Sequence, residues 1–76
     1  MKELIETIVK PLVDYPDEVI VETLEDEERI TYQLSVNKND MGKVIGKQGR
    51  VAKAIRTVVY AAGASQQKKV LLEIIE

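Results

Sequence analysis

The stretch KVIGKQGRVAKAI, residues 43–55, places two glycines around a polar pair and continues directly into a basic, amphipathic run. Glycine adopts backbone dihedrals that other residues avoid, and it lets another chain approach without a Cβ atom in the way. The first amides of the helix that follows point outward unpaired at the positive end of the helix dipole, so a phosphate is favoured there. The basic residues in and around the glycines are Lys43, Lys47, Arg50 and Lys53. The stretch therefore predicts a clamp for a phosphodiester backbone.

A short helix is predicted immediately before the glycines. Asn39 or Asp40 can cap it, and it includes residues 41–45. Gly46 stops it, so the helix is only about one turn long.

A longer helix is predicted after the glycines, from about Arg50 to Ala62, with Gly63 as its C-terminal cap. Its apolar face consists of Val51, Ala54, Ile55, Val58, Val59 and Ala62. Its opposite face consists of Arg50, Lys53, Arg56, Thr57 and Tyr60.

The remaining segments complete an α+β pattern. Apolar residues with helical spacing predict a helix over Met1–Val13, in which Pro11 causes a kink or an end near Lys10. Two β-rich segments, Glu18–Leu24 and residues 30–36, are separated by a short acidic link and predict an antiparallel hairpin. A third strand over residues 69–75 is apolar on both faces, which suits a central or partner-covered position.

Composition excludes several classes of protein. The 76 residues contain no cysteine and no histidine, which excludes disulfides, thiolate metal sites and most zinc and iron chemistry, and no cofactor is expected. No apolar run approaches the roughly 20 residues that cross a bilayer, so a soluble cytoplasmic protein without membrane contact is expected. Residues 1–76 are predicted to form one domain, whose small core favours a two-layer fold or a partner.

Charge is divided unevenly along the chain. Residues 1–40 carry four Lys/Arg and eleven Asp/Glu, whereas residues 41–76 carry seven Lys/Arg and two Asp/Glu. A local field extends only about one Debye length, so the basic segment matters more to a ligand than the net charge of −2. A nucleic-acid partner is therefore compatible with an acidic protein.

The run VIGKQGRVAKAI, residues 44–55, resembles the signature of KH domains, in which an apolar pair precedes a GXXG loop and an isoleucine, here Ile55, follows two turns later. In that family the GXXG loop clamps about four nucleotides of single-stranded nucleic acid. The αββααβ order is that of the type II KH domain, a three-stranded mixed sheet packed on three helices. The resemblance covers the whole chain, and KPLVDYPDEV, residues 10–19, together with GKQGR and the chain length, is similar to the small bacterial KhpA family.

The resemblance also implies function. Members of this family are described as RNA-binding proteins and RNA chaperones that act with a larger KH-containing partner, KhpB, with links to cell-wall biogenesis, cell shape and cell-length control. It implies that single-stranded RNA binds at Gly46, Lys47, Gln48 and Gly49, with Lys43, Arg50 and Lys53 beside them. With no Phe or Trp, stacking can come only from Tyr or Arg, so base recognition would rest on an apolar groove and sequence specificity should be low.

Plainer alternatives exist for these features. The two glycines could only end one helix and begin the next, and the basic stripe could be a solvated helix face. Tyr60 could stack on a base or pack against a strand, and Arg56 is the weakest member of the basic stripe. The acidic run Glu25–Glu28 is most simply a solvated hairpin turn.

Two other classes of function compete with RNA binding. The chain could be mainly a protein-interaction subunit, a homodimer or a heterodimer with minor RNA contacts of its own. An enzyme is disfavoured, because Gly46-Lys47 lacks the following Ser or Thr of a Walker-type nucleotide site and the carboxylates do not converge near the basic loop.

Overall fold

A computed structural model describes residues 1–75 of the chain. This part contains three α-helices and three strands in the predicted order, joined in places by single 3₁₀ turns. Their bounds are Lys2–Val9 (α1), Ile20–Glu25 (β1), Arg29–Ser35 (β2), Met41–Ile45 (α2), Arg50–Ala62 (α3) and Lys69–Ile74 (β3). The predicted αββααβ fold is confirmed.

The first helix ends where proline requires it to end. α1 stops at Val9 and is followed by a single 3₁₀ turn, Lys10–Leu12, which contains Pro11. Proline has no N–H to donate to the preceding turn, so the α-helix cannot continue through it. The predicted end near Lys10 is confirmed, and the helical spacing that continues to Val13 is not α-helix.

The three strands form one mixed sheet in the order β1-β2-β3. β1 and β2 make the predicted antiparallel hairpin, with Val21 opposite Leu34, and β2 and β3 are parallel, with Tyr32 opposite Leu72. The central strand is therefore β2, so of the two positions expected for β3 the central one is wrong, and the partner-covered one stays a prediction. β3 reaches the sheet through the crossover formed by α2 and α3, which places it beside β2 at an edge.

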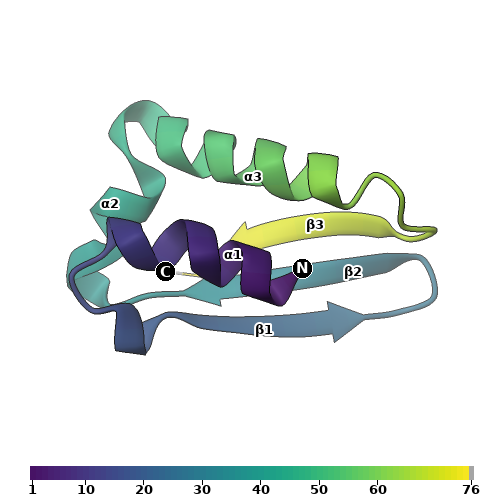
Figure 1. Ribbon diagram of the computed structural model, residues 1–76, viewed down its shortest axis with the longest axis horizontal. Coiled ribbons are helices and arrows are strands. Elements are labelled where there is room, and N and C mark those ends of the chain that lie inside the picture. The colour runs from purple at the N-terminus through teal and green to yellow at the C-terminus, as the bar shows by residue number, and fades with distance from the viewer. Residues whose placement is uncertain (76) are drawn as a thin grey trace.

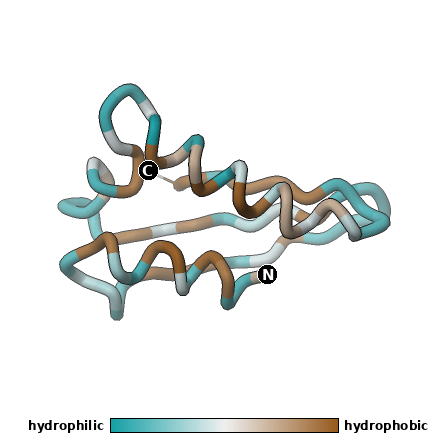
Figure 2. Tube along the Cα trace, turned by 45° about the horizontal axis from the view of Figure 1, so that its top comes forward, coloured by the Kyte–Doolittle hydropathy of each residue, from teal (hydrophilic) through white to brown (hydrophobic). Residues whose placement is uncertain are grey.

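Helices α1 and α3 cover one face of the sheet, and α2 lies at the end where β2 stops (Figure 1). The core between these two layers contains buried residues from every main element: Ile5, Val9, Val19, Val21, Leu34, Val44, Ile55, Val59, Val70 and Leu72. Hydrophobic residues follow the strands and the helices, whereas the loop between α2 and α3 is hydrophilic (Figure 2). The layered core therefore holds that loop at the surface of the molecule.

The turn before α2 differs from the prediction. The side chain of Asn37, not that of Asn39 or Asp40, caps the turn, and its Oδ1 accepts the N–H of Asn39 at 2.8 Å. Asp40 makes no capping bond to α2 and is fully buried. Its side chain serves residues far away in the sequence, as described below.

Gly63 ends α3 as predicted, but close packing is the reason that a glycine is needed. Its N–H donates to the Val59 carbonyl at 2.9 Å, and its φ of −88° is open to any residue. A Cβ at this position would lie 2.8 Å from Cγ2 of Val70. Gly63 thus lets the end of α3 approach the start of β3.

Candidate nucleic-acid interface

The loop Gly46–Gly49 has a backbone that favours glycine at both ends. Gly46 has φ +74° and ψ 176°, a combination that is essentially restricted to glycine, and Gly49 has φ +74°. Gln48 between them also has a positive φ, 57°. Glycine adopts such dihedrals without a steric penalty, whereas Gln48 bears a cost for its positive φ, so the glycines at both ends let the backbone turn here.

The two glycines have different surroundings. A Cβ on Gly46 would lie 2.4 Å from Cγ2 of Val51, so Gly46 is packed against the first turn of α3. A Cβ on Gly49 would meet nothing within 4 Å. The space beside Gly49 is open to another molecule.

Three of the four predicted bases have no carboxylate partner among the residues that the structure describes. Lys47, Arg50 and Lys53 are exposed, and none of them forms an ion pair within residues 1–75. Arg50 Nη2 donates to Gln48 Oε1 at 3.5 Å and so connects α3 to the loop. The arrangement offers three cations to a ligand at the glycine loop.

Lys43 has a different environment. Its amine forms an ion pair with Asp14 and lies 3.8 Å from Oδ1 of Asp40. The hydrogen bond to Asp14, followed by the charges of both carboxylates, raises the pKa of Lys43 above its ordinary value of 10.5. The structure therefore brings Lys43 to two carboxylates, whereas the sequence predicted it among the phosphate-binding bases.

Arg56 shows which way the basic face of α3 is turned. Its Nε donates to the carbonyl oxygen of Leu72 on the edge strand β3, at 3.3 Å. The basic side of α3 is therefore turned toward β3 at this point, with Arg56 half-buried between the two elements. Tyr60, one turn later, is 41% exposed.

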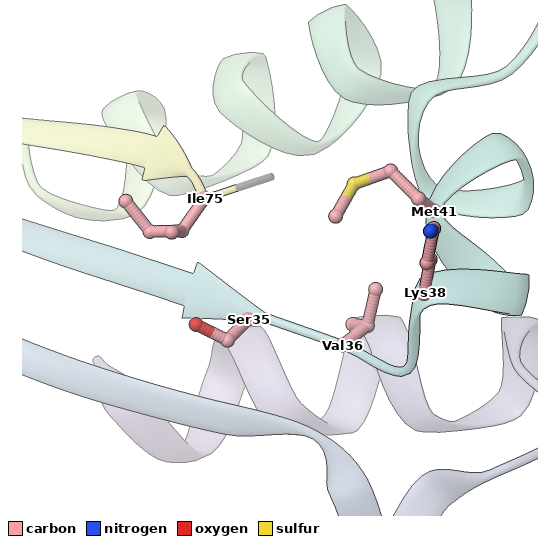
Figure 3. Close-up of a pocket in the computed structure, with 5 residues that line it drawn as sticks. All are labelled: Ser35, Val36, Lys38, Met41 and Ile75. Atoms are coloured by element: carbon pink, nitrogen blue, oxygen red, sulfur yellow. The ribbon is translucent and has the colours of Figure 1, made fainter.

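A hollow of about 610 Å³ lies at the ends of β2 and β3, and we call it the strand-end hollow (Figure 3). It is lined by Ser35, Val36, Lys38, Met41 and Ile75. Met41 is the first residue of α2 and Gly46 directly follows the last, so this short helix separates the hollow from the glycine loop. Sequence reasoning missed the hollow because its walls come from three segments that only the fold brings together.

Two negative findings apply to the residues that the structure describes. None of their His, Cys, Asp and Glu side chains forms a group of three or more that could hold a metal ion. None of their helices is long and apolar enough to cross a membrane.

Comparison with known proteins identifies the family. Residues 2–74 match the family model described as KhpA/KhpB, KH domain. The chain is 62% identical over 76 residues to the RNA-binding protein KhpA of Listeria monocytogenes serovar 1/2a, with complete coverage of both chains. It is 55% identical to the RNA-binding protein KhpA of Bacillus subtilis strain 168, covering all of this chain and 94% of that one. The chain belongs to the KhpA/KhpB family of KH domains.

A solved structure contains a similar fold. Era, in complex with MgGDPNP and nucleotides 1506–1542 of 16S ribosomal RNA, matches this KH domain with a TM-score of 0.63. The match covers 97% of this chain and 30% of the Era chain, at 17% identity. At that identity the likeness concerns the fold alone.

Proposed function

We propose that this KH domain is a non-catalytic RNA-binding module that clamps single-stranded RNA through Gly46–Gly49. The observation that carries the proposal is the glycine loop itself, which has open space beside Gly49 and is surrounded by three cations that form no ion pair within residues 1–75. Relatives that are 62% and 55% identical over the full chain bear the name RNA-binding protein. Both observations favour nucleic acid over a protein partner at this loop.

The proposed mechanism is geometric and electrostatic. The backbone of Gly49 lets the RNA backbone approach closely, and the N-terminus of α3 presents the positive end of its dipole to a phosphate. The N–H groups of Gly49 and Arg50 already donate to the carbonyls of Gly46 and Lys47, so the dipole and the side-chain cations carry this attraction. Lys47, Arg50 and Lys53 supply attraction that added salt weakens. No cofactor takes part in this mechanism, and with no Phe or Trp in the chain there is little scope for stacking on the bases.

The family extends the proposal to cellular roles. We assign this chain the role of an RNA chaperone that acts with a KhpB-type KH protein, in cell-wall homeostasis and cell-length regulation. The support for this assignment is the family membership.

Binding of a fluorescent single-stranded RNA tests the loop. The variant Lys47→Asp/Gln48→Asp places two anions where the phosphate would lie. We expect the affinity of this variant for the RNA to fall by about 10-fold or more. The matched control is Lys2→Asp/Thr7→Asp, which changes the net charge equally on the exposed side of α1. Equal affinities for the loop variant and the control variant would contradict the proposal.

A second candidate function, self-association, is favoured by a different observation. A mainly apolar hollow of about 430 Å³ lies between α1 and α3, and we call it the α1–α3 groove. Its lining includes Leu12 and Val58, which are 41% and 46% exposed. A homodimer, or a heterodimer with a KhpB-type protein, would cover these side chains and combine two weak RNA contacts into stronger binding.

Sedimentation velocity at micromolar concentration tests the second candidate. We expect the wild type to be dimeric and Val58→Glu to be monomeric, because the substitution puts a charge in the apolar groove. Thr57→Glu, at the neighbouring exposed position outside the groove, should remain dimeric. A monomeric wild type, alone and with a KhpB-type partner, would exclude this function.

A further inference from the structure

Asp40 is a fully buried carboxylate just before α2, and both of its oxygens bind the backbone of a distant segment. Oδ1 accepts the N–H of Asp14 at 3.1 Å, and Oδ2 accepts the N–H of Tyr15 at 3.0 Å. These two amides lie in the connection between α1 and β1. Asp40 therefore ties that connection to the start of α2.

Lys43 completes the same network one turn later. Its amine pairs with the Asp14 carboxylate and lies 3.8 Å from Asp40 Oδ1. One positive charge thus faces two negative charges, so the three groups together carry a net charge of −1. A phosphate approaching Lys43 would meet no net attraction at this point.

The position of the glycine loop depends on how α2 is held. α2 has only five residues, too few for a helix to be stable by itself, so contacts with the rest of the fold must keep it in place. The buried Val44 provides one such contact, and the Asp40 and Lys43 bonds provide further ones. The N–H of Gly46 then donates to the Gly42 carbonyl at 2.8 Å, so the loop begins directly from this helix.

We propose that Asp40 and Lys43 are positioning residues that hold α2, and with it the loop Gly46–Gly49, against the connection between α1 and β1. In this arrangement Lys43 acts on RNA binding through Asp14 and Asp40 and does not contact the RNA backbone. The proposal rests on the proposed RNA-binding function, because its effect on affinity is exerted through the glycine loop.

A double-mutant cycle on the two exposed partners tests the proposal without touching buried Asp40. The proteins are the wild type, Lys43→Met, Asp14→Asn and the double variant, with Lys47→Met as the reference for a direct phosphate contact. The probe is a fluorescein-labelled oligouridine of about eight nucleotides, twice the length that one KH domain clamps. Affinity is measured at several salt concentrations. For single strands, each lost phosphate contact reduces the magnitude of the slope of log K against log salt by about 0.7.

If Lys43 positions the loop, Lys43→Met and Asp14→Asn each weaken binding about threefold or more. The double variant then binds RNA about as well as whichever single variant binds less tightly. The salt slopes of these three variants match that of the wild type. Lys47→Met reduces the magnitude of the slope by about 0.7. The proposal is overturned if Lys43→Met reduces the magnitude of the slope or leaves the affinity unchanged. It is also overturned if Asp14→Asn tightens binding, because the released Lys43 amine would then contact a phosphate.

The amide signals of Gly46 and Gly49, recorded by NMR in the RNA-free protein, separate the two proposals. Lys43→Met and Asp14→Asn should shift both signals, because they change the placement of α2. If no protein of the set binds the probe, the proposed function fails, whereas these shifts still decide whether Lys43 positions the loop. Unshifted signals in both variants would overturn the positioning role.

Discussion

Gly46 and Gly49 bound the same loop, but different contacts require them to be glycine. We predict that Gly46→Ala destabilises the fold by about 2 to 4 kcal/mol, because the new Cβ combines a positive φ with a clash against Val51. Gly49→Ala should cost about 1 to 2 kcal/mol, from the positive φ alone. Urea unfolding of the two variants measures both values.

Gly42 in α2 provides the control, because a Cβ there meets nothing within 4 Å and its backbone is helical. Gly42→Ala should be as stable as the wild type or more stable by up to about 1 kcal/mol. Val51→Ala should recover part of the loss in Gly46→Ala, since it removes Cγ2, which would lie 2.4 Å from the new Cβ, although the Cβ of residue 51 stays. Equal destabilisation by Gly46→Ala and Gly49→Ala would contradict the described packing of the loop.

At the same scale, the sequence predicted which charges lie near the glycine loop but not the carboxylate partners of Lys43. The glycines and the bases Lys47, Arg50 and Lys53 lie within eight residues of one another, so their proximity follows from the chain itself. Lys43 is equally near in sequence, but its partner Asp14 is 29 residues away. Only the fold could show that this charge is neutralised.

Among the elements, the β1–β2 turn provides a pH-dependent test. Oδ1 of Asp26 accepts the N–H groups of Glu28 and Arg29, each at 2.8 Å. These two bonds hold the pKa of Asp26 below its ordinary value of 3.8. Ionised Asp26 therefore stabilises the turn at every pH above about 3.8, and this contribution is lost as the pH falls through the lower, folded-state value.

We predict that Asp26→Asn lowers the thermal midpoint at pH 6 and that its difference from the wild type shrinks as the pH falls below 3.8. Glu27→Gln is the control, because Glu27 is an exposed carboxylate of the same turn whose side chain accepts no hydrogen bond among the described residues. The thermal midpoint of Glu27→Gln should not differ from that of the wild type in the pH-dependent way expected for Asp26→Asn. A difference in thermal midpoint between Asp26→Asn and the wild type that stays constant from pH 6 to pH 2.5 would refute the prediction.

The elements themselves were largely predictable because their signals are local. The helical spacing of apolar residues predicted α1 and α3, and the alternation of apolar and polar residues predicted β2. Pro11 predicted where α1 ends. The position of β3 at the sheet edge was not predictable from its apolar pattern, because strand order depends on a crossover that the pattern does not encode. The role of Asp40 was missed for a similar reason, since its partners are 25 and 26 residues away.

Across the whole molecule, the acidic run Glu25–Glu28 lies far from the glycine loop. The acidic turn between β1 and β2 lies at the opposite end of the molecule from the loop between α2 and α3 (Figure 1). The longest dimension is 35 Å, whereas the Debye length at physiological salt is about 8 Å. The acidic turn is therefore screened from the glycine loop and does not oppose RNA binding there.

The salt dependence of RNA binding tests the central claim most directly. Affinity of the wild type for a fluorescent oligouridine is measured between about 50 and 200 mM salt. Three phosphate contacts, from Lys47, Arg50 and Lys53, predict a slope of log K against log salt of about −2, and Lys47→Gln should reduce its magnitude by about 0.7. A wild-type slope near zero, or a slope and affinity that Lys47→Gln leaves unchanged, would contradict the phosphate clamp.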